Sequence, residues 1–185
     1  MTSLRVLLEA LTFAIFLRPS LYWVPNSLPF LKLGVTEFDP EFSVRRPVPL
    51  CMTLFAEQLE RLQAMNVVRQ RNAGRLRQIL ESMPQFDVPR LAEGNHPNYV
   101  RLPVLAADRA TRDRAVAALV AQGIGATAFY PGGLCDIPGI EKHLAPDAGH
   151  CKGAEEIAER LFTLPTHAYV EDRDLKSMAA ILERV

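Results

Sequence analysis

Apolar residues recur at helical spacing through a long stretch in the middle of the chain. Between residues 49 and 83 the spacing is that of an amphipathic helix, carried by Leu54, Phe55, Leu59, Leu62, Met65, Leu76, Ile79 and Leu80. Pro47 and Pro49 favour a helix start, and Pro84 favours its end. At about 1.5 Å per residue such a helix is roughly 50 Å long. That length is typical of a helix that bridges two domains or two subunits.

Short strands are predicted after this helix. In residues 99–104, apolar and other positions alternate, which predicts a strand, and Pro103 favours an edge or a strand end. Residues 126–130 predict a second short strand. Residues 131–149 contain several glycines and prolines and are expected to form a long loop.

Helices are predicted between and after these strands. Residues 111–122 carry one, which Gly123 is expected to end. Apolar spacing marks two more around residues 154–161 and 171–182, and acidic residues open the last one. We therefore expect residues 84–185 to form an α/β domain of the two-layer α+β kind, with helices on one face of a small, mainly antiparallel sheet.

The first 48 residues have a different character. Residues 4–17 are nearly all apolar, and a Pro-rich connector with aromatic residues follows. A membrane-spanning helix needs roughly 20 apolar residues, and Arg18 and Pro19 end this run too early. We expect a short helix that packs on protein. Contact of residues 1–31 with a membrane surface and a true span remain open alternatives.

Charge and cysteine content narrow the functional classes. The 21 basic and 21 acidic side chains give a formal net charge of zero, which argues against a nucleic-acid partner because phosphate binding needs a basic excess. Three cysteines are too few and too scattered for a disulfide framework, which favours a reducing, cytoplasmic compartment. Cys135, His143, His150 and Cys151 have metal-ligand chemistry, but their spacing fits no regular zinc module, and no metal site is predicted.

Four stretches, in order, resemble the DegT/DnrJ/StrS family of pyridoxal-phosphate (PLP) sugar aminotransferases. QLERLQAMNVVRQRNAGRLRQIL (58–80) resembles the long interdomain helix of that family, and NYVRLPV (98–104) resembles the first strand of its small domain. RDRAVAALVAQGIGATAFYP (112–131) is similar to the helix, turn and strand that follow. CKGAEEIAERLFTLPTHAYVEDRDL (151–175) is similar to the closing signature. The resemblance implies an N-terminal extension (1–48), an interdomain helix (49–83) and an aminotransferase small domain (84–185).

The resemblance also implies chemistry that we do not expect this chain to perform alone. Family members hold PLP mainly in an N-terminal domain, through a Schiff-base lysine. Lys142, Lys152 and Lys176 lie in segments that match the small domain, where no cofactor lysine is expected. Lys32 has the family's S-x4-K spacing with Ser27, but it lacks the preceding strand-rich domain and the Gly-rich turn after it. We expect a solvated loop lysine and no catalytic residue in this chain.

Five residues are candidates for binding. Ser43 and Arg45 stand where the family has a turn that contacts the cofactor phosphate of the partner subunit, although an asparagine of that turn is replaced here. Asn98, Tyr130 and His167 stand where family members face the sugar or close the pocket. Tyr130 would stack on a sugar ring, and His167 would donate to a phosphate. For each, a solvated, packing or capping role is the alternative.

The sequence thus supports two classes of function. The resemblance implies that the chain is the C-terminal portion of an aminotransferase that acts on a nucleotide-linked keto-sugar with glutamate as amino donor, and we expect it to be inactive alone. Alternatively it is a non-catalytic interaction module, or a membrane-surface subunit, that completes a separate N-terminal half. A homodimer or a lysine-bearing N-terminal half is the expected partner, and the location is cytoplasmic or at a membrane surface.

Overall fold

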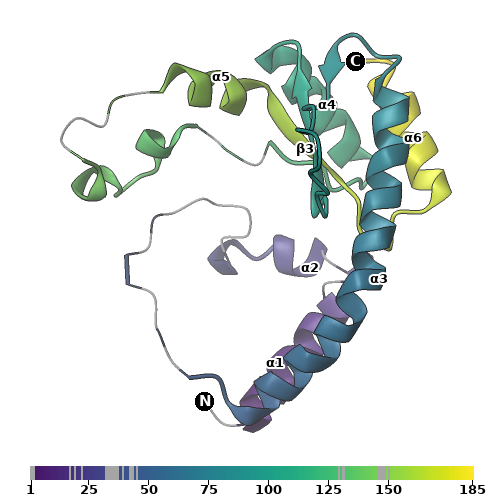
Figure 1. Cartoon of the computed structure of the whole chain (residues 1–185). Coiled ribbons are helices and arrows are strands. Elements are labelled where there is room, and N and C mark those ends of the chain that lie inside the picture. Colours follow the sequence, from purple (N-terminus) through teal and green to yellow (C-terminus); the bar gives the residue numbers. More distant parts are fainter. Residues whose placement is uncertain are drawn as a thin grey trace. The chain divides into compact units, whose positions relative to one another are not determined.

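The computed structural model of the chain describes residues 3–16, 18, 20–21, 23–31, 38, 40–41, 44, 46–128, 130, 132–145, 149 and 151–185. Its backbone groups into two compact units (Figure 1). The first contains Met1–Val35 and Asp39–Gln63, and the second contains Thr36–Phe38 and Ala64–Val185. The long helix α3 (Pro49–Leu80) contributes its first half to one unit and its second half to the other.

The first unit is helical where it is described. It contains α1 (Ser3–Phe16), the short α2 (Trp23–Asn26), the 3-10 turn η1 (Pro29–Leu31) and the first half of α3. On α1, Val6 is buried, and Arg5 pairs with Glu9 at 2.7 Å between Nε and Oε1. Within the described residues, α1 and the other helices are all too short or too polar to cross a membrane.

Helix α3 confirms the long helix predicted from the apolar spacing. Its 32 residues begin at Pro49, as expected, and end three residues before the predicted boundary. The pair four residues apart, Glu57 and Arg61, forms an ion pair of 2.7 Å. In the second half of the helix, the apolar stripe is buried in the core of the second unit at Ala73, Leu76 and Leu80.

The second unit is built on a three-stranded antiparallel sheet of order β1-β2-β3. Its strands are β1 (Phe86–Asp87), β2 (Arg101–Ala106) and β3 (Leu161–Pro165). In β2, every second residue is buried, namely Leu102, Val104 and Ala106. This alternation confirms the predicted strand. The paired strand begins two residues later than expected, because Tyr99 has a positive φ of 45° and lies outside the ladder.

Pro103 is not on an edge strand, contrary to the prediction. It lies in the central strand β2, opposite Thr163 of β3. The N–H and C=O of Thr163 are used in bonds to Thr127 on its other side, so Thr163 and Pro103 form a non-hydrogen-bonded pair. The nitrogen of Pro103 therefore faces the β1 side, where pairing begins only at Leu105. A proline fits there because no ladder bond is lost.

Three helices complete the second unit: α4 (Arg109–Ala121), α5 (Lys152–Arg160) and α6 (Asp172–Leu182). Asp108 caps α4 by accepting a bond from the amide of Thr111, and Gly123 ends it with a φ of +73°. In Figure 1, α4, α6 and the second half of α3 lie around the sheet. Their shared core contains Leu119, Phe162, Leu164, Leu175, Met178 and Leu182. The predicted two-layer α+β fold, with a long helix before it, is confirmed.

Two local predictions were wrong. Residue 161 was expected to continue a helix, but the chain passes from α5 directly into β3, whose five residues are all buried. Residues 126–130 were expected to form a strand, but their described residues make a single bridge, between Thr127 and Thr163. The loop of 131–149 contains two 3-10 turns, η2 (Leu134–Asp136) and η3 (Glu141–His143).

Candidate functional site

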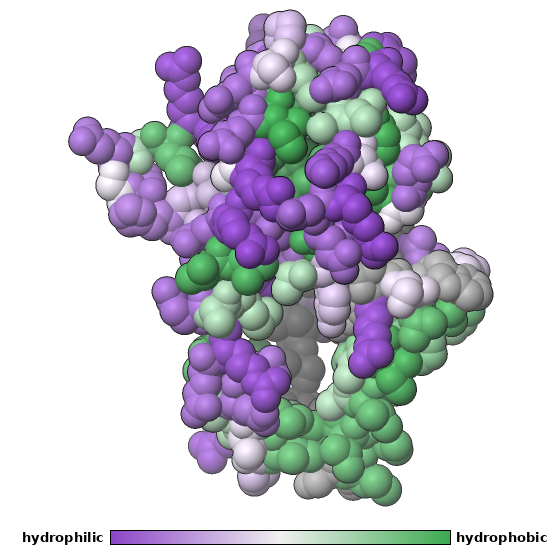
Figure 2. Space-filling view, turned by 90° about the vertical axis from the view of Figure 1, so that its right-hand side faces the viewer, coloured by the Kyte–Doolittle hydropathy of each residue, from purple (hydrophilic) through white to green (hydrophobic). Residues whose placement is uncertain are grey.

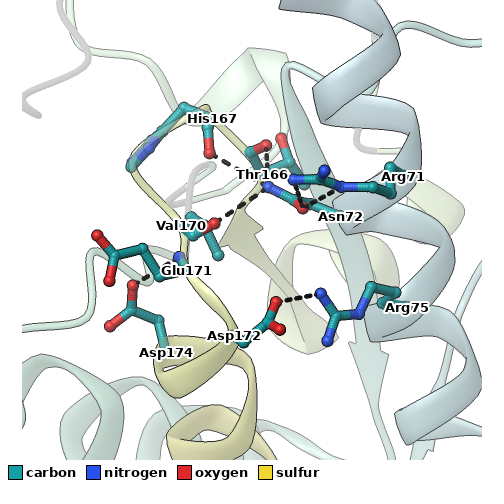
Figure 3. Close-up of polar contacts among 9 residues, drawn as sticks. All are labelled: Arg71, Asn72, Arg75, Thr166, His167, Val170, Glu171, Asp172 and Asp174. Atoms are coloured by element: carbon teal, nitrogen blue, oxygen red, sulfur yellow. Dashed lines mark hydrogen bonds and ion pairs between the residues drawn. The ribbon is translucent and has the colours of Figure 1, made fainter.

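A buried asparagine on α3 fastens the turn that follows β3. Asn72 is fully buried, and its side-chain Nδ2 donates to the carbonyl oxygens of Thr166 (3.1 Å), His167 (3.3 Å) and Val170 (3.5 Å) (Figure 3). Its Oδ1 accepts two longer contacts of 3.4 Å from Arg71. The backbone groups of α3 bond to one another within the helix. The side-chain amide of Asn72 can therefore donate to the three carbonyl oxygens of the turn and hold them in place.

The same turn is bonded to the start of β2. Thr166 is fully buried, and its Oγ1 lies 2.5 Å from the carbonyl oxygen of Tyr99 and 3.1 Å from that of Val100. The phenolic oxygen of Tyr99 accepts a bond of 3.2 Å from Arg77 on α3. Helix α3, the segment before β2 and the turn after β3 therefore meet at one end of the sheet, and the positive φ of Tyr99 is held there by bonds at both of its ends.

His167 lies at this end of the sheet with an unsatisfied ring nitrogen. Its Nδ1 is buried and has no hydrogen-bond partner among the described residues, while its ring contacts Tyr169 edge to face at a centroid distance of 5.9 Å. Burial, and then the positive charges of Arg101 and Arg69, lower the pKa of His167, and the carboxylate of Asp174 opposes them. The imidazole is therefore neutral near pH 7 and presents one donor and one acceptor nitrogen.

The two arginines near His167 bond to neutral groups. Arg101 donates to Thr163 through Nε (2.6 Å to Oγ1) and Nη2 (3.1 Å to the carbonyl oxygen), and also to the carbonyl of Gly125. Arg69 donates to Oδ1 of Asn66 at 3.2 Å. Neither arginine has a carboxylate partner in the described part of the chain. This end of the sheet thus carries positive charge that no direct ion pair cancels, a setting that favours an anionic group.

The predicted binding residues divide into separate places. Asn98 is exposed and precedes β2, next to the residues bonded to Thr166, so it lies at the same end of the sheet as His167. Tyr130 is 50% exposed and lies three residues after Thr127, which bridges to Thr163 in the middle of β3. Ser43 and Arg45 lie outside the described residues.

The described lysines lie on the surface of the second unit. Lys142, Lys152 and Lys176 are all exposed, so none is enclosed where a Schiff base would be protected from water. Lys32 lies outside the described residues. Among the described residues, no group of three or more His, Cys, Asp or Glu side chains is arranged for a metal ion. His150 is not described.

Sequence reasoning missed the residues that organise this site. Asn72 was seen only as part of a family-like Asn-Ala pair, and Arg69 and Arg101 were not singled out. The sequence held a signal for Asn72. It lies next to Ala73 and one turn from Leu76 on the apolar face of the helix, so its polar side chain is expected to be buried, and a buried polar group needs hydrogen-bond partners. For the arginines there was no such signal, since arginine is common in exposed helices and strands.

Comparisons with known proteins agree with the fold. The model of the DegT/DnrJ/EryC1/StrS aminotransferase family matches residues 50–183. A comparison with curated proteins finds no match.

Three solved structures share this architecture. A DegT DnrJ EryC1 StrS aminotransferase from Brucella abortus is 24% identical, with a TM-score of 0.61 over 82% of this chain and 40% of its own. DesV from S. venezuelae, in complex with a ketimine intermediate, is 20% identical, with a TM-score of 0.66 over 84% of this chain and 42% of its own. GDP-4-keto-6-deoxy-D-mannose-3-dehydratase from E. coli, with bound hydrated PLP, is 19% identical, with a TM-score of 0.63 over 80% of this chain and 38% of its own. At these identities the likeness shows the fold alone, and the chain spans about two fifths of each.

Proposed function

Because the chain belongs to the DegT/DnrJ/EryC1/StrS aminotransferase family, we propose that it is the C-terminal portion of a PLP-dependent aminotransferase acting on a nucleotide-linked keto-sugar. The observation that carries the proposal is the family match over residues 50–183, which coincides with α3 and the α+β unit that follows it. Bound PLP supplies the electron sink for amino transfer in such enzymes. A cytoplasmic location and a homodimer, or a lysine-bearing N-terminal half as partner, belong to the same proposal.

The chain alone is inactive in this proposal. Amino transfer through PLP needs a lysine amine at the cofactor. The three described lysines are exposed on the small domain, away from any enclosed site, so the lysine must come from another domain or chain. The chain's own contribution is then to bind and orient the substrate and to close over it.

The end of the sheet around His167 is our candidate for recognition of an anionic group. Arg69 and Arg101 supply positive charge, the neutral His167 supplies a ring nitrogen that is unsatisfied within the described residues, and Asn98 supplies an exposed amide. A phosphate of a nucleotide-linked sugar and a carboxylate of the amino donor share the required chemistry. The Asn72 and Thr166 bonds hold the His167 backbone in place for that contact.

The other candidate residues have separate roles in this proposal. Tyr130, which is half exposed, would stack on a sugar ring presented by another part of the assembly. Ser43 and Arg45 would approach the cofactor phosphate in a partner subunit. Catalysis is not assigned to any residue of this chain.

An amino-transfer assay tests the proposal. The full chain is incubated with PLP, glutamate and a panel of nucleotide-linked keto-sugars, and 2-oxoglutarate formation is followed with and without a lysine-bearing N-terminal half. We expect product only when that half is present. Product from the chain alone would show that it carries its own cofactor lysine, and no product in either case would count against the aminotransferase assignment.

One observation favours the second candidate, an interaction module. Along α3 a stripe with alternating spacing of three and four residues runs through Met52, Phe55, Leu59 and Leu62, then Asn66, Arg69, Ala73, Leu76 and Leu80. Its second half is buried or half-buried in the small domain, but the first four residues are 40–58% exposed. A stripe of this spacing is the surface that packs against another helix. The first unit therefore offers an apolar surface for a protein partner.

Helix α1 adds to this apolar surface. Leu4, Leu8 and Leu11 are 55–66% exposed, and Figure 2 shows hydrophobic surface over this helix. The single cation of α1 is paired with Glu9, so α1 lacks the free basic face that anionic lipids attract. This favours a protein partner over a membrane surface.

Two measurements separate these options. Size-exclusion chromatography with light scattering should show that the chain self-associates or binds an N-terminal half. Leu59→Asp should weaken this association. The matched variant Glu60→Asp, on a different face of α3, should leave it unchanged. Liposome flotation of the full chain and of a chain lacking residues 1–31 tests the membrane option. Flotation that depends on residues 1–31 would overturn our preference for protein.

A further inference from the structure

Two of the three cysteines line one cavity in the second unit. Cys135 of η2 and Cys151, the N-cap residue of α5, both border a space of about 250 Å³ that Leu144, Gly149 and Ala154 also line. Cys135 is half-buried and Cys151 is exposed, and both thiols are free. They are 16 positions apart in the sequence, so their shared cavity is produced by the fold of the loop between them.

The side chain of Cys135 contacts the chain close to Cys151 in the sequence. The Sγ of Cys135 lies 3.5 Å from the carbonyl oxygen of Gly149, which is two residues before Cys151. Two residues span at most about 7 Å. A bridged pair needs Cα atoms about 4.4–6.8 Å apart, which is a distance of the same order as this span.

One side of the cavity is fixed and the other side is open. Asp136 holds η2 by accepting a bond of 2.7 Å from the amide of Gly133, so Cys135 sits on a defined turn. A Cβ placed on Gly149 would meet no atom within 4 Å, so the space beside Gly149 is open.

We propose that Cys135 and Cys151 form a reversible internal disulfide when the chain meets a low-molecular-weight disulfide such as oxidised glutathione. The thiolate of Cys151 attacks one glutathione sulfur, which forms a mixed disulfide and releases one glutathione thiolate. The thiolate of Cys135 then attacks the sulfur of Cys151 and releases the second. The two protein thiols lose two protons and two electrons, and oxidised glutathione becomes two molecules of glutathione.

The bridge would tie η2 to the start of α5, and α5 continues directly into β3. Oxidation would thereby close the loop of residues 135–151 on the small domain. This inference goes beyond the proposed aminotransferase role and does not depend on it. Cys51 provides an internal control, because it lies on α3 in the first unit and does not border the cavity.

The test uses the full reduced chain. It is incubated with oxidised glutathione, quenched with an alkylating reagent, digested and mapped by mass spectrometry. We expect a peptide pair joined through Cys135 and Cys151, with Cys51 alkylated or glutathionylated, and the same result in Cys51→Ser. In Cys135→Ser we expect a stable glutathione adduct on Cys151 instead.

Two comparisons show whether the fold is responsible. Because a short loop also closes in an unfolded chain, the ratio of bridged to open form is measured at set glutathione ratios in buffer and in concentrated urea. We expect it to be at least about tenfold higher in buffer, and the Tm of the bridged chain to exceed that of the reduced chain by several degrees. An equal ratio in urea, bridges that involve Cys51, or glutathione adducts on both cysteines without a bridge would overturn the proposal.

Discussion

Replacing Asn72 by alanine removes the side chain that holds the turn after β3 on α3. Its two N–H hydrogens are shared among the carbonyls of Thr166, His167 and Val170, and Asn72 itself is fully buried. A typical hydrogen bond contributes about 1 kcal/mol net, whereas a buried acceptor left without a donor costs about 1–3 kcal/mol. Thr166 and Val170 are buried, so water does not readily replace the lost donors. We expect Asn72→Ala to lower the free energy of unfolding of the second unit by about 2–4 kcal/mol.

A second asparagine on the same helix provides the control. Asn66 is also buried, but its side chain accepts one bond from Arg69 and donates to none of the loop carbonyls. Asn66→Ala should therefore cost about 1 kcal/mol. Urea denaturation followed by far-UV circular dichroism gives both values. In thermal melts the difference should appear as a fall in Tm of about 5–15 °C for Asn72→Ala.

The amide exchange rates of residues 166–170 give a local readout. They should rise in Asn72→Ala and stay close to the original values in Asn66→Ala. If Asn72→Ala costs no more than Asn66→Ala, or if exchange in this turn is unchanged, the turn is held by Thr166 and the core rather than by the asparagine.

Three further predictions concern charge, capping and packing. An NMR titration should place the pKa of His167 below the ordinary value of about 6.5, and Arg101→Gln should raise that pKa. Because His167 binds a proton more readily in the unfolded chain than in the folded one, the stability conferred by the neutral ring is complete above about pH 6.5 and falls at lower pH. A measured pKa above about 6.5 would contradict this. Asp108→Ala should lower the Tm by removing the α4 cap, whereas Asp108→Asn should retain most of it; equal losses would point to charge alone. Leu76 is 1% exposed, and Leu76→Ala should lower the free energy of unfolding by about 2–5 kcal/mol in urea denaturation. Leu59 lies on the same stripe but is 49% exposed, and Leu59→Ala should lower it by less than about 1 kcal/mol. Similar losses for the two variants would mean that the first half of the stripe is already covered.

The sequence predicted the long helix and the helices of the small domain because their signals are local. Helix α3 has eight apolar residues close to helical spacing between flanking prolines, and α4 is followed by a glycine at the turn that requires a positive φ. The strand β3 could not be recognised in the same way. Leu161–Pro165 is buried on both faces, so it lacks alternation, and it follows α5 without a loop. Its pairing with β2 depends on residues about 60 positions away.

The candidate site shows the same limit. His167 and Asn98 were predicted from a resemblance, and the pairing of β2 with β3 brings them to one end of the sheet. The segment before Tyr130 joins the sheet through a single bridge, Thr127 to Thr163, which spacing along the chain cannot reveal. The lowered pKa of His167 arises from burial and from Arg69 and Arg101, which are far from it in the sequence. Such effects follow from tertiary packing and not from the residue type.

In the proposed function, the lysine that holds PLP comes from another domain or chain. The full chain is equilibrated with PLP, reduced with borohydride and mapped by mass spectrometry. We predict that Lys142, Lys152 and Lys176 are labelled weakly and to similar extents, as expected for exposed amines, with no aldimine absorbance band beforehand. One lysine labelled stoichiometrically would contradict the claim, and loss of that label and of the band in Lys32→Ala would identify a cofactor site that this chain builds for itself.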